Sequence, residues 1–140
     1  MREVLFRAKE KADGEWVYGW YCRYPFGKWP LKDAIIPSEE AEIGCFRFVE
    51  VDHSTVWQYT GLTDKNGKRI FEGDVVVIEA DCIPSFMLNR YVVVWDDDQA
   101  AYKLLKDNTI YDLPMGRMEI IGNIHDNPEL LGAHDGGPED

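Results

Sequence analysis

The sequence predicts a mainly β fold, and three observations support this prediction. β-Branched and aromatic residues gather in short runs separated by Gly, Asn, Asp and Pro, which is the pattern of strands joined by turns. Residues 75–78 are four consecutive β-branched residues, typical of a strand that is buried on both faces. Helix signals are few, and the segment 125–132, "HDNPELLG", predicts one short helical turn near the C-terminus, opened by Pro128.

Residues 1–60 predict an N-terminal β layer. The strands are expected at residues 4–6, 15–22, 45–51 and 56–59. Trp16, Tyr18 and Trp20 share one face of the second strand, because side chains alternate along a strand. Residues 25–42 contain three prolines and are expected to form a long surface excursion rather than a central strand, since proline cannot donate to a sheet ladder.

Residues 61–131 predict a small SH3-like barrel, on which the N-terminal layer packs within a single domain. Five short strands are expected there, at residues 74–79, 89–95, 101–106, 109–113 and 119–124. Residues 132–140 are polar and glycine-rich, so they predict a flexible tail. The places of eight apolar residues in these runs predict that they are buried: Val4, Phe6, Val75, Val77, Val93, Trp95, Ile120 and Ile124.

The segment "QYTGLTDKNGKRIFEGDVVVI", residues 58–78, is either a ligand site or a scaffold. Asn66 and Gly67 have the composition of a tight turn between two apolar runs. Gly61 and Gly73 add backbone freedom on either side, and we expect at least one of the three glycines to have a positive φ. The scaffold interpretation is favoured, because it explains the spacing without any ligand.

Three basic residues at this turn, Lys65, Lys68 and Arg69, form a dense positive cluster in the sequence. Three acidic residues flank them: Asp64, Glu72 and Asp74. Because positive and negative charges balance locally, a solvated hairpin tip is favoured over a nucleic-acid site. The cluster stays a candidate interaction surface.

Motifs for catalysis, metal binding and cofactor binding do not match the sequence. The glycine of "DKNGKR" is in the wrong place for a calcium loop, and the histidines and cysteines lack the close spacing of zinc ligands. The glycines of "TGLTDKNGK" do not form a phosphate-binding loop, and no nucleophile elbow occurs. We therefore predict no enzyme activity, no catalytic residue, no cofactor and no metal.

The chain is acidic, with 15 basic and 26 acidic residues and a net charge of -11. This charge opposes binding to duplex DNA and to anionic lipid surfaces, and favours a basic partner. No apolar run is long enough to span a membrane. The unpaired pattern of Cys22, Cys45 and Cys82 is typical of free thiols in a reducing compartment, so a cytoplasmic location is expected.

Three blocks resemble the YopX family of phage and prophage proteins. They are "REVLFRAK" with "DGEWVYGWY", then "VWQYTGLTDKNGKRIFEGDVV", and finally "EIIGNIHDNPELL". The resemblance implies a mainly β fold and a phage or prophage origin. It supplies no catalytic residue, because the biochemical role of the family is not established.

Three functions are compatible with these observations. The leading one is a non-enzymatic phage-derived accessory protein that binds another protein or a second copy of itself, through β edges or exposed aromatic residues such as Trp29 and Trp57. The alternative is a nucleic-acid-associated SH3-like module, which the net charge disfavours. An acidic mimic of DNA ranks below both, because it requires carboxylates arrayed on one surface.

Overall fold

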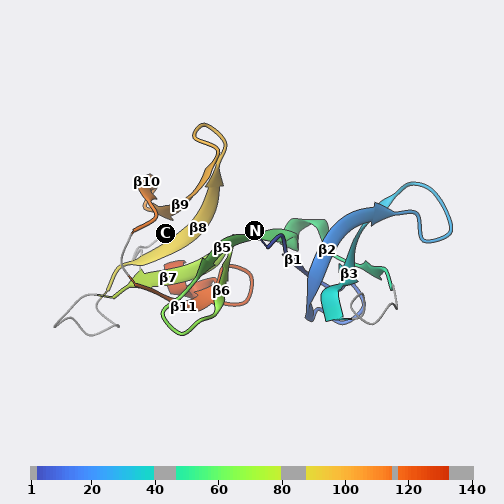
Figure 1. The fold of residues 1–140 in the computed structure, drawn as a ribbon, viewed down its shortest axis with the longest axis horizontal. Coiled ribbons are helices and arrows are strands. Elements are labelled where there is room, and N and C mark those ends of the chain that lie inside the picture. Colours follow the sequence, from blue (N-terminus) through green and yellow to red (C-terminus); the bar gives the residue numbers. More distant parts are fainter. Residues whose placement is uncertain (1–2, 40–46, 80–87, 115–116, 133–140) are drawn as a thin grey trace. The chain divides into compact units, whose positions relative to one another are not determined.

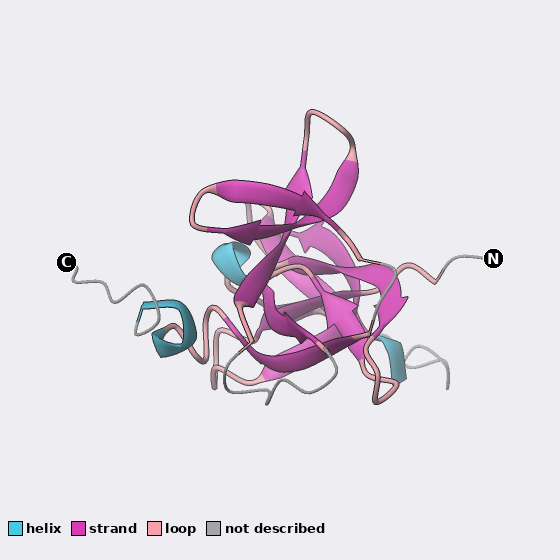
Figure 2. Cartoon of the chain, turned by 90° about the vertical axis from the view of Figure 1, so that its left-hand side faces the viewer, coloured by secondary structure: helices cyan, strands magenta, loops and turns pink. Residues whose placement is uncertain are grey.

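The computed structural model describes residues 3–39, 47–79, 88–114 and 117–132. Strands make up most of this part of the chain, as Figure 2 shows in magenta, so the predicted mainly β class is confirmed. The chain divides into two compact units, residues 1–61 (unit 1) and residues 62–140 (unit 2). The predicted tail and the residues Cys45 and Cys82 lie outside the described residues.

Unit 1 contains the first five strands of a six-stranded antiparallel sheet, whose order is β4-β3-β2-β1-β5-β6 (Figure 1). Its strands are β1 (Phe6–Lys9), β2 (Trp16–Tyr24), β3 (Lys32–Pro37), β4 (Val49–Glu50) and β5 (Trp57–Thr63), the last of which runs on into unit 2. A short 3-10 helix, η1 (His53–Thr55), precedes β5, and the side chain of Asp52 caps it by accepting from the backbone N–H of Ser54.

Strand β3 contradicts the predicted surface excursion at residues 25–42. It pairs with β2 on one side and β4 on the other, and both Ala34 and Ile35 are fully buried. The prolines cause no conflict with the ladder, because Pro25 and Pro30 lie in the β2–β3 connection and Pro37 ends the strand.

The core of unit 1 lies on one face of this sheet. Ala8, Ile35, Val49 and Val51 are buried together there, with side chains such as Phe6 and Tyr21 packed against them. Gly19 allows a close approach of β2 to β3, because a Cβ at this position would meet the backbone oxygen of Ile36 at 2.0 Å. The absence of a side chain is therefore required at Gly19.

Unit 2 contains a second antiparallel sheet, in the order β10-β9-β8-β7-β11. Its five strands confirm the predicted number: β7 (Asp74–Ile78), β8 (Arg90–Asp96), β9 (Ala101–Lys106), β10 (Thr109–Asp112) and β11 (Met118–Asn123). This sheet is open, with β10 and β11 at its ends, so the described residues do not show the predicted closure into a barrel. The expected helical turn is present as α2 (Glu129–Gly132).

The core of unit 2 contains Val76, Val93, Leu104 and Met118, together with Ile70 from the short strand β6 (Arg69–Phe71). Of the eight residues predicted to be buried, Val75, Val77 and Val93 are buried, whereas Phe6 and Ile120 are half-buried.

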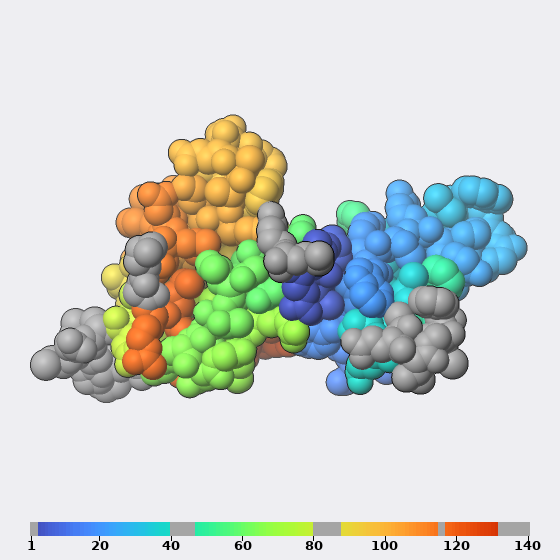
Figure 3. Space-filling model, viewed as in Figure 1, coloured from blue at the N-terminus to red at the C-terminus, as the bar shows by residue number. Residues whose placement is uncertain are grey.

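The burial prediction was wrong for Val4, Trp95 and Ile124, which are exposed. Val4 precedes β1 and Ile124 follows β11, so neither lies within a strand. Trp95 lies near the end of the long β8–β9 hairpin, which reaches beyond the other strands of unit 2 in Figures 1 and 3. It packs there against Tyr102, with ring centroids 5.0 Å apart.

Candidate protein-docking site

The turn between β5 and β6 is organised by the buried carboxylate of Asp64. Its Oδ1 accepts hydrogen bonds from the backbone N–H groups of Asn66 at 2.8 Å and Lys68 at 2.9 Å. Its Oδ2 accepts from the N–H of Ile120 on β11 at 3.1 Å. Burial alone would raise the pKa of Asp64, but these three donors hold it below its ordinary value. Asp64 therefore joins the turn to the last strand of unit 2.

The three glycines of this segment all have positive φ, at +92° for Gly61, +82° for Gly67 and +87° for Gly73. Gly67 also closes a tight turn by donating its N–H to the carbonyl of Asp64. The prediction of a positive φ is therefore confirmed. These backbone conformations and the hydrogen bonds of Asp64 account for the glycine spacing of the segment without a ligand, as the scaffold interpretation requires.

The basic residues of this turn do not act as one positive patch. The Nζ of Lys65 lies 3.8 Å from Glu79 and 3.5 Å from Glu119, and its backbone N–H donates to the carbonyl of Met118. Lys68 and Arg69 are exposed, and Lys68 lies close to the negative charge of Asp64. Lys65 is therefore paired with Glu79 and Glu119, and not with the flanking acidic residues from which the charge balance was predicted.

Strand β2 presents aromatic side chains on the face of unit 1 opposite its core. Tyr18 and Trp20 are each 42% exposed, and Trp16 is half-buried beside them. Because alternate residues point to the same side, the three rings form one row with a spacing of about 6.8 Å. Large exposed aromatic groups in a row are typical of interaction surfaces. We call Trp16, Tyr18 and Trp20 the aromatic row.

Cationic side chains adjoin the aromatic row. The register places Arg7 opposite Tyr18 and Lys9 opposite Trp16. The guanidinium carbon of Arg7 lies 4.6 Å from the ring centroid of Trp16 and 5.2 Å from that of Trp57. The Nζ of Lys9 lies 5.3 Å from the Trp16 centroid. These cation–π contacts hold Trp16 in a fixed orientation at one end of the row.

The two tryptophans proposed from the sequence as exposed interaction residues have different environments. Trp57 is 8% exposed, because it is packed among Arg7 and Trp16, so the expectation of an exposed Trp57 is wrong. Trp29 is 75% exposed in the β2–β3 connection. The aromatic row itself was visible in the sequence as a shared strand face, whereas its neighbours Arg7 and Lys9 come from another strand.

Comparisons with known proteins identify the family. The family described as "YopX protein" matches residues 5–132 of this chain, which is nearly its whole length. The chain belongs to the YopX family. A crystal structure of protein EF1440 from Enterococcus faecalis is similar to this YopX chain, with a TM-score of 0.57 and 23% identity over 94% of this chain and 99% of that one. No curated protein matches the chain.

A polar cluster in this YopX-family chain was not predicted from the sequence. The Tyr21 hydroxyl donates to Oδ1 of Asp33, and the Nδ1 of His53 lies 3.2 Å from the same oxygen. Burial and the bond to Asp33 raise the pKa of Tyr21, which keeps the phenol protonated and a poor nucleophile. Burial alone would raise the pKa of Asp33. Hydrogen bonds from Tyr21 and His53 outweigh this effect, so the pKa of Asp33 is below its ordinary value. The cluster fastens β2, β3 and η1 to one another.

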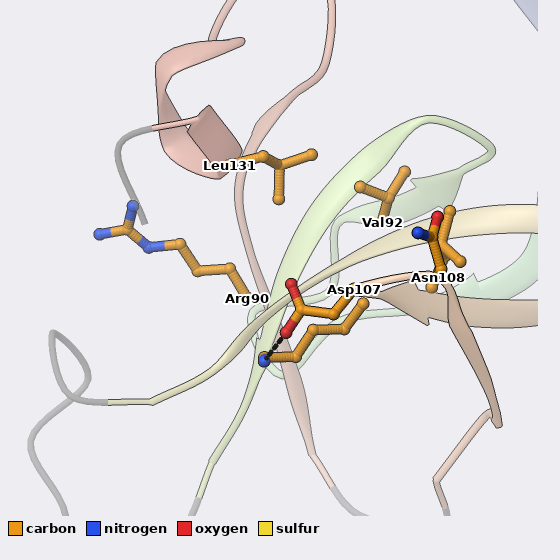
Figure 4. A pocket seen from close by; sticks show the side chains of 7 residues that line it. Arg90, Val92, Asp107, Asn108 and Leu131 are labelled. Carbon is orange, nitrogen blue, oxygen red and sulfur yellow. Dashed lines mark hydrogen bonds and ion pairs between the residues drawn. The ribbon is translucent and has the colours of Figure 1, made fainter. Parts of the chain in front are cut away.

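Unit 2 of this YopX-family chain has a half-open groove of about 410 Å³ between β8, the β9–β10 turn and α2 (Figure 4). Its two cationic groups already have partners within the chain: Arg90 donates to the carbonyl of Leu130, and Lys106 bonds to Asp107 at 2.6 Å. The bond to Asp107 raises the pKa of Lys106. This internal pairing makes the groove a weaker candidate than the aromatic row.

Three other features bear on the expected functions. Within the described ranges, no three His, Cys, Asp or Glu side chains come together as a metal-binding group, and Asp96 and Asp97 bond instead to Asp98 and Trp95 at a hairpin tip. None of the helices in the described ranges is long and apolar enough to cross a membrane. Cys22 is half-buried and free, and burial raises the pKa of its thiol.

Charge is unevenly divided along this YopX-family chain. Residues 1–61 carry eight basic and ten acidic side chains, whereas residues 62–140 carry seven basic and sixteen acidic ones. The net charges are therefore -2 and -9, which together give the -11 of the chain. The unit that presents the aromatic row is close to neutral, so charge repulsion does not keep partners away from it.

Proposed function

We propose that this YopX-family protein is a non-enzymatic accessory protein of phage or prophage origin that binds a partner protein in the bacterial cytoplasm. The observation that carries the proposal is the aromatic row, where Tyr18 and Trp20 are exposed on a nearly neutral unit. Tyrosine and tryptophan are the residue types that dominate binding energy in protein interfaces. The row is uncharged along β2, so the partner is expected to contribute an apolar surface.

The partner's binding should depend on the aromatic row. We expect the double variant Tyr18→Ser/Trp20→Ser to bind the partner at least about 100-fold more weakly, since two aromatic anchors are removed. The measurement has two steps: affinity capture from prophage-induced cells, followed by titration of the purified captured protein against wild type and variant. Both side chains are exposed, so the variant should keep its fold, which circular dichroism checks.

A matched control separates this surface from aromatic exposure in general. Trp29→Ser removes the most exposed tryptophan but leaves the row intact. If Trp29→Ser weakens binding and the double variant does not, the docking site lies in the β2–β3 connection. Equal binding by all three proteins would contradict both assignments.

A nucleic-acid-associated module with an SH3-like barrel is the second candidate. Aromatic side chains beside cations can stack on the bases of a single strand, and the aromatic row adjoins Arg7 and Lys9. Titration of labelled single-stranded DNA and RNA against wild type and the double variant tests this candidate. Micromolar binding that is lost in the variant would favour it over the protein-binding function.

Duplex DNA is expected not to bind appreciably at physiological salt. Non-specific binding requires a protein to neutralise several phosphates, whereas this chain carries -11 and Lys65 is already paired with acidic groups. An anisotropy titration at about 0.15 M salt is the measurement, because lower salt exaggerates surface attraction. Micromolar binding would contradict this prediction. If that binding disappeared when Lys65, Lys68 and Arg69 were changed to glutamate, the turn would be the binding site.

A further inference from the structure

In the described part of the chain, β10 forms an outer edge of the sheet in unit 2. It pairs with β9 through Thr109↔Lys106, Ile110↔Leu105, Tyr111↔Leu104 and Asp112↔Lys103, and it is the last strand in the sheet order. All its residues are exposed, with Ile110 at 51% and Tyr111 at 44%. Natural edge strands are often protected by a short length, charged side chains, proline, a bulge or a covering segment. Strand β10 is short and carries Asp112, but it contains no lysine, proline or bulge.

The opposite edge of the same sheet, formed by β11, is protected by a bulge and by a covering turn. Strand β11 carries a bulge between Ile120 and Gly122. The β5–β6 turn also covers it, because Asp64 accepts from the N–H of Ile120 and Lys65 donates to the carbonyl of Met118. The backbone of β11 is therefore partly occupied, in contrast to β10.

The β9–β10 turn determines which backbone groups face outward. Asp107 and Asn108 both have positive φ, at 51° and 65°, as in a two-residue hairpin whose flanking residues form a hydrogen-bonded pair. Pairs then alternate along the hairpin, so the N–H and C=O groups of Thr109 and Tyr111 face β9. Those of Ile110 and Asp112 face the open edge.

Two apolar rows reach this edge, one on each face of the sheet. Val92, Leu105 and Ile110 are in register on one face, and Val93, Leu104 and Tyr111 are in register on the other. Val93 and Leu104 are completely buried, whereas Ile110 and Tyr111, the residues of the two rows that lie on β10, are about half exposed. A further strand beside β10 would cover Ile110 and Tyr111 together.

We infer that β10 pairs with β10 of a second copy of the chain, antiparallel, about a twofold axis at Tyr111. This register places Tyr111 opposite Tyr111 of the second copy and Ile110 opposite Asp112 of the second copy. The backbone N–H and C=O groups of Ile110 and Asp112 face outward. In this register each of these groups forms a hydrogen bond with the second copy. The edge is thus complementary to itself, as a twofold interface requires.

The charges at this edge allow two copies to meet, although unit 2 is acidic. Lys103 pairs with Asp112, and Lys106 pairs with Asp107. Two basic side chains therefore balance two acidic ones along the hairpin, and the pairing brings no bare carboxylates together. The overall charge of -11 on each copy opposes association at long range, so salt should strengthen the dimer.

Sedimentation velocity over a concentration series up to about 1 mM tests the dimer, since an interface of one short strand is small. We expect the wild-type protein to dimerise with increasing concentration, and Ile110→Pro to associate at least tenfold more weakly. Proline at this position removes an outward N–H but no bond to β9, so the hairpin should be retained. Asp97→Asn, at the exposed β8–β9 tip, is the control and should dimerise like the wild type.

Cysteine cross-linking tests the register and does not depend on the proline variant folding. Opposed Cα atoms in a non-hydrogen-bonded pair are about 4.5 Å apart, within the range of a disulfide. Tyr111→Cys should therefore form an intermolecular disulfide on mild oxidation, identified by mass spectrometry of the linked peptide, whereas Ile110→Cys should link at least tenfold more slowly.

Three outcomes would overturn the inference. The first is a wild-type protein that stays monomeric throughout the series. The second is a dimer that persists in Ile110→Pro without linkage of Tyr111→Cys, which would place the interface elsewhere. The third is faster linkage of Ile110→Cys, which would reject the Tyr111 axis.

Discussion

Replacing Asp64 with alanine is expected to lower the free energy of unfolding of unit 2 by about 2–4 kcal/mol. The carboxylate is buried and accepts three backbone hydrogen bonds, and its removal leaves the half-buried N–H of Ile120 without this acceptor. The measurement is denaturant unfolding combined with amide hydrogen exchange in β7 and β11. Asp96→Ala is the matched control, since Asp96 also accepts a backbone N–H, from Asp98, but at an exposed tip.

The pH dependence of the same pair of proteins gives an independent check. Because the pKa of Asp64 is lowered in the folded state, its contribution to stability is present above the ordinary carboxyl pKa of about 3.9. This contribution is lost as pH falls through the lower pKa of the folded protein. The stability difference between wild type and Asp64→Ala should therefore be constant near neutral pH and shrink below about pH 4. A difference that grows on acidification would contradict the assignment.

Gly19→Ala is expected to destabilise unit 1 by about 2–4 kcal/mol. The new Cβ would lie 2.0 Å from the carbonyl oxygen of Ile36 and 2.9 Å from the backbone nitrogen of Ser38. These are backbone atoms, so β2 and β3 must separate to make room, and their ladder weakens. Four of the five tryptophans lie in unit 1, so intrinsic fluorescence mainly reports its unfolding.

A second glycine provides the control for this variant. Gly27 has a φ of +85°, but a Cβ there would meet nothing within 4 Å. Gly27→Ala should cost roughly 1 kcal/mol, from backbone strain alone. If the two variants are equally stable, the close approach of β2 to β3 is not an important constraint.

The strands of unit 2 were predictable because their signals are local. Most are short runs rich in apolar residues that end at turn residues, such as Asp107 and Asn108 before β10. The signal for the turn at Asn66 and Gly67 is also local. Its sequence contains both the residue that closes the turn and the aspartate that caps it.

The remaining features depend on contacts between residues far apart in the chain. Trp57 is buried because it packs with Arg7, fifty residues earlier, and no pattern around Trp57 indicates this. Trp95 follows the alternation of a strand, but β8 extends beyond the core that would bury it. The polar cluster of Tyr21, Asp33 and His53 likewise combines single residues from three elements.

The bond from Ile120 to Asp64 also affects when unit 2 can fold during synthesis. Fifty-six residues separate the two partners, and β11 pairs with β7 over a similar interval. Translation proceeds from the N-terminus, so β7 and the Asp64 turn leave the ribosome well before the strand that completes them. The sheet that contains β1 to β5 is complete once β6 ends at Phe71, so its folding does not wait for β11. A nascent chain stalled before Met118 should therefore hold a folded unit 1 and an unfolded unit 2.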